Sequence, residues 1–248
     1  MEKSQYIGIT ETSDPAFHLD IFNHLHEGNI IITKSLTNKL LEKLIEHKER
    51  CILHMTCTGM GGTKIEPFVP TIEKTRKQLK KLIEGGFPIK QIVLRIDPIV
   101  PTEKGVQTAK NVLTLFSDLH IPRVRISFLD MYNHVKTRFN DNNVPLPYDN
   151  FHASSKQRFE AFDELKSLAL SLGYGKVVTC GEPGFDETPC ISQEDINILE
   201  LQDKITLEGR KEQRTSCSCP QNKRELIPYK ERTEHKCGHG CLYCYMKD

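Results

Sequence analysis

Residues 72–97 read IEKTRKQLKKLIEGGFPIKQIVLRID and contain, in one stretch, the structural unit that recurs along the chain. Apolar residues recur at spacings of three and four from Ile72 to Glu84, which is the period of an amphipathic helix. Gly85 and Gly86 stand where a helix C-cap is expected. The apolar run Gln91 to Asp97 is then typical of a buried strand. We therefore interpret the stretch as one helix followed by one strand.

The same alternation extends toward both ends of the chain and predicts an α/β fold. Five further strands are expected at Tyr6 to Thr10, Asn29 to Thr33, Cys51 to Thr56, Arg123 to Leu129 and Lys176 to Cys180. Four further helices are expected at Ala16 to His26, Leu36 to Glu49, Lys104 to Leu119 and Ser155 to Leu172. Six successive βα units form either an open, doubly wound parallel sheet or a curved, partly closed barrel.

In both architectures a ligand lies at the carboxyl ends of the strands. The sequence places seven polar side chains there: Glu11, Lys34, Thr58, Arg95, Asp97, Asp130 and Glu182. Arg95 and Asp97 are two residues apart on one strand and therefore point to the same face, either as a buried ion pair or as a substrate clamp. Together with Glu182 they are the candidate catalytic residues.

Composition narrows the class of protein. The chain has 248 residues, a formal net charge of +1, 38% hydrophobic residues and 27% charged residues, which is ordinary for one globular domain. Its first residues lack the apolar run of a signal peptide, and no later run approaches the length of a membrane span. We therefore expect a cytoplasmic protein without a membrane segment.

Nine cysteines in such a chain favour metal binding over disulfides, because cytoplasmic thiols are kept reduced. Five of them follow Ile198, where the apolar periodicity stops and charges dominate. We expect a barrel-like domain over residues 1–198 and a cysteine-rich iron–sulfur tail over residues 199–248 that packs across its mouth.

The last cysteines form the motif CGHGCLYC at residues 237–244. Cys237, Cys241 and Cys244 can bind three irons of a [4Fe–4S] cluster and leave the fourth iron open. The alternative is a structural zinc site, which needs a fourth ligand such as His235 or His239.

Four more cysteines, Cys180, Cys190, Cys217 and Cys219, match the ligand number of a second [4Fe–4S] cluster or of a zinc ion. The alternative is that Cys180 is a buried strand residue and that one of the others is a free thiol. Cys51 and Cys57 flank a strand and are expected in the core.

The terminal motif, with Tyr243 directly before its last cysteine, resembles the cluster loop of radical S-adenosyl-L-methionine (SAM) enzymes. With KIEPFVPTIEKTRKQLKKL (residues 64–82) and RVRISFLDMYNHVKTRF (residues 123–139), it is similar to a bacterial family described only as a domain of unknown function. Members of that family end in a CGHGCLYCY-type tail. The family in turn is similar to radical SAM proteins of the spore photoproduct lyase type.

This resemblance implies a partial (β/α)6 TIM-like barrel and a cluster that binds SAM and generates a 5′-deoxyadenosyl radical. It implies a substrate such as a nucleotide or nucleic-acid base, and an electron donor such as flavodoxin or ferredoxin. Tyr243, Gly61 and Gly62 are the nearest counterparts of the SAM-contacting residues, although a plain loop also explains the two glycines. One departure is clear: radical SAM enzymes usually carry the cysteine loop after the first strand, not at the end of the chain.

Two other functions remain open from the sequence. One is a non-catalytic iron–sulfur or zinc protein that transfers electrons or only stabilises its fold. The other is a zinc-stabilised barrel whose chemistry depends on Arg95, Asp97 and Glu182.

Overall fold

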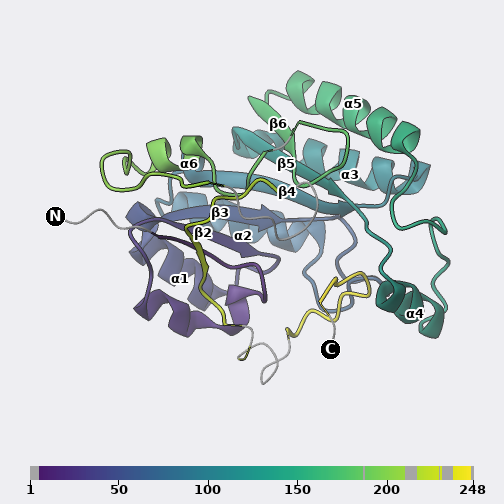
Figure 1. Ribbon diagram of the computed structural model, residues 1–248, viewed down its shortest axis with the longest axis horizontal. Helices are drawn as coiled ribbons and strands as arrows, with labels where there is room; N and C mark the ends of the chain where they lie inside the picture. Colours follow the sequence, from purple (N-terminus) through teal and green to yellow (C-terminus); the bar gives the residue numbers. More distant parts are fainter. Residues whose placement is uncertain (1–5, 187, 210–216, 229, 231–236, 247–248) are drawn as a thin grey trace.

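The computed structural model describes residues 6–186, 188–209, 217–228, 230 and 237–246. Its described strands form one seven-stranded sheet in the order β6-β5-β4-β3-β2-β1-β7 (Figure 1). All neighbouring strands are parallel. The strands are β1 (Ile7–Ile9), β2 (Asn29–Thr33), β3 (Cys51–Thr56), β4 (Ile92–Ile99), β5 (Arg123–Phe128), β6 (Lys176–Thr179) and β7 (Lys223–Glu225). The α/β class and the six predicted strands are confirmed, and β7 is an addition from the tail.

The strand order argues against one of the two architectures that the sequence left open, the doubly wound sheet. A doubly wound sheet reverses its strand order at a switch point, whereas β1 to β6 lie side by side in chain order. That order is the one found in barrels. Among the described residues no pairing joins β6 to β7, so the sheet is open and a TIM-like barrel stays a prediction.

Four helices cover one face of the sheet, here called the helix-covered face. They are α1 (Asn38–Glu46), α2 (Ile72–Glu84), α3 (Glu103–Phe116) and α5 (Ser155–Ser171). The N-cap of α2 is Thr71, whose hydroxyl accepts from the Lys74 N–H at 3.4 Å. Among the described residues, no helix is both long and apolar enough to cross a bilayer.

The predicted helix from Ala16 to His26 is wrong. The segment forms two 3-10 helices, η1 (Pro15–Phe17) and η2 (Leu19–Asn23). His18, with φ −136° and ψ 62°, lies between them and interrupts the helical backbone. Three short 3-10 helices occur elsewhere: η3 (Lys48–Arg50), η4 (Ile89–Gln91) and η5 (Ser117–Leu119). Two helices were not predicted, α4 (Asn133–Asp141) and α6 (Gln193–Ile198).

Alternate residues of each strand serve the two faces, as the two-residue period requires. On β3, Leu53 and Met55 join the large core beneath the helices, whereas Ile52 joins a smaller cluster on the opposite face. That smaller cluster includes Ile196 of α6 together with Leu199, Leu201 and Ile205 from the tail. The opposite face is therefore covered by α6 and by the tail.

The described part of the tail has apolar and backbone anchors of its own. β7 pairs with β1, and the residues that follow it, Leu226 and Ile227, are buried in the main core. Further on, Leu242 and Tyr243 pack with Val135 and Phe139 of α4. Figure 1 shows this last segment, in yellow, lying beside α4. The tail is thus attached to the domain at both ends by ordinary packing.

Candidate functional site

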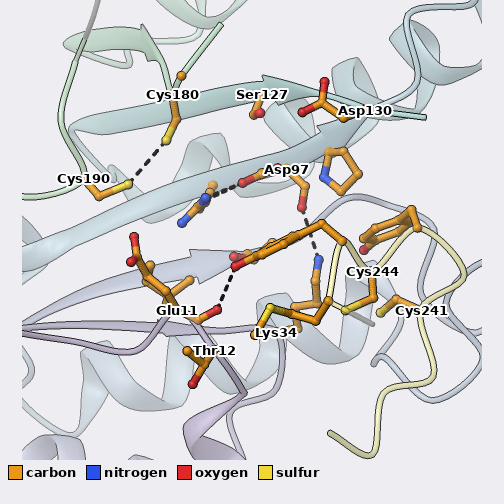
Figure 2. Close-up of a pocket in the computed structure, with 18 of the residues that line it drawn as sticks. Glu11, Thr12, Lys34, Asp97, Ser127, Asp130, Cys180, Cys190, Cys241 and Cys244 are labelled. Atoms are coloured by element: carbon orange, nitrogen blue, oxygen red, sulfur yellow. Dashed lines mark hydrogen bonds and ion pairs between the residues drawn. The ribbon is translucent and has the colours of Figure 1, made fainter. Parts of the chain in front are cut away.

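A cavity of about 670 Å³ lies at the carboxyl ends of the strands, on the face opposite the helices. Strand-end residues Glu11, Lys34, Arg95, Asp97 and Asp130 line it, as the parallel sheet predicts. All seven cysteines predicted as metal ligands also line it: Cys180, Cys190, Cys217, Cys219, Cys237, Cys241 and Cys244. Figure 2 shows Cys180 and Cys190 on one side of this space, and Cys241 and Cys244 on the other.

The seven thiols come from segments that are far apart in the sequence. Cys180 follows β6, Cys190 lies on the next loop, and the others belong to the tail. Cys51 and Cys57 are buried in the helix-covered core, as expected. No disulfide joins any of the nine, so all are present as thiols.

A buried carboxylate, Asp14, holds the loop of the terminal motif. It accepts from His239 Nε2 at 2.7 Å, from the Thr33 hydroxyl at 2.7 Å and from the Lys34 N–H at 2.7 Å. Burial raises the pKa of Asp14, but the hydrogen bonds from His239, Lys34 and Thr33 outweigh burial and keep that pKa below its usual value. Asp14 is therefore an anionic anchor between the end of β2 and the cysteine loop.

A second buried carboxylate, Glu66, holds Tyr243. The Tyr243 hydroxyl donates to Glu66 Oε1, which also accepts from Lys34 Nζ at 3.2 Å. The Thr58 hydroxyl donates to Glu66 Oε2 at 2.6 Å. Tyr243 thus lines the cavity with its hydroxyl already bonded to protein.

The two glycines predicted to contact SAM lie beside Glu66. The Gly62 N–H donates to the Glu66 carbonyl at 2.9 Å, and Gly62 has a positive φ of 77°. A Cβ on Gly61 would lie 2.0 Å from the Pro70 carbonyl oxygen, so no side chain fits there. Neither glycine is among the residues that line the cavity.

The end of the terminal motif is held by Arg138 of α4. Its guanidinium donates to the carbonyls of Cys244 at 2.6 Å and Met246 at 3.0 Å. The Leu242 N–H donates to the Ile65 carbonyl at 3.0 Å. The three terminal cysteines are therefore presented on a loop that is fixed from several sides.

Two partly buried thiols of this loop, those of Cys237 and Cys241, have raised pKa values and therefore favour the protonated form when no metal is bound. Burial raises the pKa of Cys241 to about 12, although the Lys34 ammonium opposes the shift. Burial also raises the pKa of Cys237. A bound metal ion removes the proton from a ligating thiol outright, so metal binding here would release protons.

The other thiols form a tighter group. Cys180 Sγ and Cys190 Sγ are 3.3 Å apart, and the Cys190 N–H donates to Cys219 Sγ at 3.2 Å. One carboxylate oxygen of Glu11 and the sulfurs of Cys190 and Cys219 all lie within 4.8 Å of one another. Cys217 lines the cavity and is only partly buried.

The three candidate catalytic residues are placed differently. Arg95 and Asp97 line the cavity and form the predicted ion pair, with Nε and Oδ2 at 2.8 Å. Glu182 does not line it, because its Oε1 accepts from the Ser127 hydroxyl at 2.8 Å and the Phe128 N–H at 2.7 Å. Burial raises the pKa of Glu182 to about 7 against these hydrogen bonds.

The carboxylates of Glu66 and Asp14 and the guanidinium of Arg138 were not identified as site residues from the sequence. Glu66 lies in the stretch KIEPFVPTIEKTRKQLKKL that carries part of the family resemblance, and Asp14 lies in TETSDPAF near the N-terminus. No local pattern connects either carboxylate to the terminal motif. Of the two histidines considered as a fourth zinc ligand, His235 lies outside the described residues, and His239 is the partner of Asp14.

Comparisons with known proteins give a family but no activity. The sequence profile of a family described as "Domain of unknown function (DUF1848)" matches residues 15–246. No curated protein matches the chain significantly.

Among solved structures, the chain is similar to a lysine/ornithine decarboxylase complexed with cadaverine from Vibrio vulnificus, with 14% identity and a TM-score of 0.37. That match covers 61% of this chain and 38% of the decarboxylase. A dihydropteroate synthase from Yersinia pestis, in complex with a sulfonamide drug, matches with 11% identity and a TM-score of 0.34, covering 80% of this chain and 66% of the synthase. The chain thus spans less than two thirds of either protein.

Proposed function

Because the chain belongs to the DUF1848 family, whose description names no reaction, we propose a function from the cavity itself: a radical SAM-like iron–sulfur enzyme. Cys237, Cys241 and Cys244 would hold a [4Fe–4S] cluster. The observation that carries the proposal is that all three thiols line one cavity at the carboxyl ends of parallel strands, where α/β proteins bind their ligands.

The donor set fits an iron–sulfur cluster. A single tetrahedral zinc ion with Zn–S bonds of 2.3 Å holds its sulfurs about 3.8 Å apart. Among the described residues the compact set of three ligand atoms is the Glu11, Cys190 and Cys219 group, not the terminal triplet. Wider spacing suits thiolates that bind separate irons of one cluster.

The surrounding residues would prepare the loop before any metal arrives. Asp14 orients His239, Glu66 orients Tyr243, and Arg138 fixes the backbone of Cys244. Lys34 places its ammonium near Cys241, where it favours the thiolate form that metals require. The chain itself therefore supplies ligand positioning and charge.

A [4Fe–4S] cluster with one open iron supplies the binding and reductive cleavage of SAM. The protein's own contribution is the cavity, whose volume of about 670 Å³ lies within the roughly 300–1,000 Å³ range of small-molecule sites. Arg95, Asp97 and Asp130 line it and would orient a polar substrate. A nucleotide or nucleic-acid base is the substrate class that we propose, with flavodoxin or ferredoxin as the electron donor.

Three further parts of the proposal concern the fold, the cellular compartment and a second metal centre. We interpret the sheet, with its sequential strand order, as a partial TIM-like barrel whose mouth the tail covers. Since such clusters need reduced thiols, we propose the cytoplasm as the compartment. The second thiol group would hold a second metal centre.

The test is anaerobic reconstitution of the full chain with iron and sulfide, followed by dithionite and SAM. We expect 5′-deoxyadenosine to accumulate, and Cys241→Ala or Cys244→Ala to lower its yield at least 100-fold. Cys57→Ala removes a buried thiol outside the cavity and is the matched control. A fully loaded cluster that yields no 5′-deoxyadenosine would contradict the proposal.

One observation favours a second candidate function, a closed metal site without SAM chemistry. His239 is buried, its Nε2 is bonded to Asp14, and its Nδ1 has no hydrogen-bond partner among the described residues. A ring that donates to a carboxylate through one nitrogen is the usual arrangement of a metal ligand. If His239 is the fourth ligand, His239→Gln loses the metal; if the fourth position is open, the variant keeps its iron and sulfide.

A further inference from the structure

We propose that Glu11, Cys180, Cys190 and Cys219 form a site for a single thiophilic divalent cation, such as Zn²⁺, and that Glu11 takes the place of Cys217 as the fourth ligand. This inference deepens the second-centre part of the proposed function. It does not depend on SAM chemistry at the terminal triplet.

Spacing is the first argument. Sulfurs bound to one zinc ion lie about 3.8 Å apart, given Zn–S bonds of 2.3 Å. Cys180 Sγ and Cys190 Sγ are 3.3 Å apart, and Glu11, Cys190 and Cys219 have ligand atoms within 4.8 Å of one another. Three of the donors are thus already close to the spacing around one ion and Cys180 adjoins them through Cys190, whereas a cubane cluster would have to push these sulfurs apart.

Two of the four donors, Glu11 and Cys190, are held in place by contacts with other residues. Glu11 follows β1, and its Oε2 accepts from Lys223 Nζ of β7 at 2.7 Å. The Cys190 loop is held by Arg125, whose guanidinium donates to the carbonyls of Thr188 at 2.8 Å and Pro189 at 2.9 Å. These contacts orient both donors before the ion binds.

Charge is the second, independent argument. Arg125 is only 4% exposed, yet among the described residues no carboxylate pairs with it and its Nε has no partner. Its positive charge opposes the rise in the pKa of Cys180, and the positive charge of Arg95 acts in the same direction on the pKa of Cys180 and Cys190. A buried cation without a counterion is costly. Three thiolates and a carboxylate around a divalent cation carry a net charge of −2, which would balance the positive charge of Arg125.

A backbone N–H group also stabilises one of the thiolates. The Cys190 N–H donates to Cys219 Sγ at 3.2 Å, and a hydrogen bond to sulfur favours its thiolate form. Lys223 brings a further positive charge to Glu11. The site thus contains ligand atoms for a soft metal ion, and it also contains positively charged side chains that balance the charge of those ligands.

The test uses the full chain carrying Cys237→Ser, Cys241→Ser and Cys244→Ser, so that the terminal triplet cannot bind metal. The probe is Co²⁺ under anaerobic conditions, followed by its displacement with Zn²⁺. We expect one equivalent of Co²⁺ with thiolate-to-cobalt charge-transfer absorption. Cys190→Ser or Cys219→Ser should weaken binding at least 100-fold, and Glu11→Gln at least tenfold.

Cys217→Ser and the core control Cys57→Ser should leave the affinity unchanged, and circular dichroism checks that each variant is folded. Folded protein that binds no cobalt would overturn the proposal. So would Cys217→Ser weakening binding as much as Cys219→Ser, because that result indicates a four-cysteine centre. SAM cleavage by the unmodified chain is measured separately, so failure of one proposal is distinguishable from failure of the other.

Discussion

The two faces of the sheet are stabilised in different ways. The helix-covered face buries a continuous apolar core that draws on α1, α2, α3 and α5. The opposite face has a smaller apolar cluster, and next to it the carboxylates Asp14 and Glu66, the buried His54 and seven thiols around one cavity. Hydrophobic burial needs no partner of defined chemistry, whereas each buried polar group does. The helix-covered face therefore stabilises the fold, and the opposite face depends on specific hydrogen bonds between buried polar side chains.

The largest expected effect on stability comes from a substitution in the helix-covered core, away from the cavity. Phe116 at the end of α3 is fully buried in the helix-covered core. Phe116→Ala should lower the free energy of unfolding by about 4 kcal/mol, because it removes a large apolar side chain and leaves a cavity. Urea denaturation should show the same loss with and without metal. Leu170→Ala, at a half-exposed position on α5, is the control and should change stability by less than about 0.5 kcal/mol.

Asp14→Asn tests the anchor of the cysteine loop. The change removes the charge that His239, Thr33 and the Lys34 N–H all contact, at a cost of about 2–3 kcal/mol. Limited proteolysis should cut the tail before the rest of the domain unfolds. Asp118→Asn breaks an exposed ion pair with Arg76 and should cost less than about 1 kcal/mol. Equal protease resistance of the Asp14 variant and the unmodified chain would show that Asp14 does not hold the tail.

Tyr243→Phe removes one hydrogen bond to Glu66 and keeps the ring packed against α4. We expect a loss of about 1.5 kcal/mol, since the acceptor is a buried carboxylate that Lys34 still contacts. Hydrogen exchange of the terminal loop should accelerate. Tyr174→Phe is the counterpart on the helix-covered side, where the hydroxyl donates to the Leu113 carbonyl at 2.8 Å. Loop exchange that is faster in the Tyr174 variant than in the Tyr243 variant would contradict the assignment.

The smallest effect at neutral pH concerns His54, which is fully buried on the opposite face with no partner for either ring nitrogen among the described residues. Burial, with the charges of Arg125, Arg95 and Arg123, keeps the pKa of His54 well below its usual value. The folded state therefore holds His54 neutral, and the unfolded state gains a proton as the pH falls below about 6.5. Stability should fall by up to about 1.4 kcal/mol per pH unit below that value.

His54→Leu removes this proton linkage and buries no unpaired nitrogen. At pH 7.5 we expect it to change stability by at most about 1 kcal/mol. Denaturation measured from pH 7.5 to pH 5 should show a smaller decline in the variant than in the unmodified chain. An identical decline in both would assign the pH dependence to other groups.

The elements that sequence patterns predicted best are those with a strong local period. β3 and α2 have the bounds that were expected, because an apolar run or a repeated apolar spacing reflects the backbone period directly. The same period placed Arg95 and Asp97 side by side. α4 was missed because its buried apolar residues are just Val135 and Phe139. β7 consists of Lys223–Glu225 and has no strand-like pattern; it forms because its backbone pairs with the free edge of β1.

The sequence alone determined the βα scaffold, the side of the sheet where a ligand belongs, and the thiols that could bind metal. Tertiary structure decided that the seven thiols share one cavity, and that Asp14 pairs with His239 and Glu66 with Tyr243. Asp14 and His239 are 225 positions apart. A backbone period reflects the positions of a few neighbouring residues, whereas such contacts join residues distant in sequence and depend on the tertiary fold. No local sequence pattern predicts them.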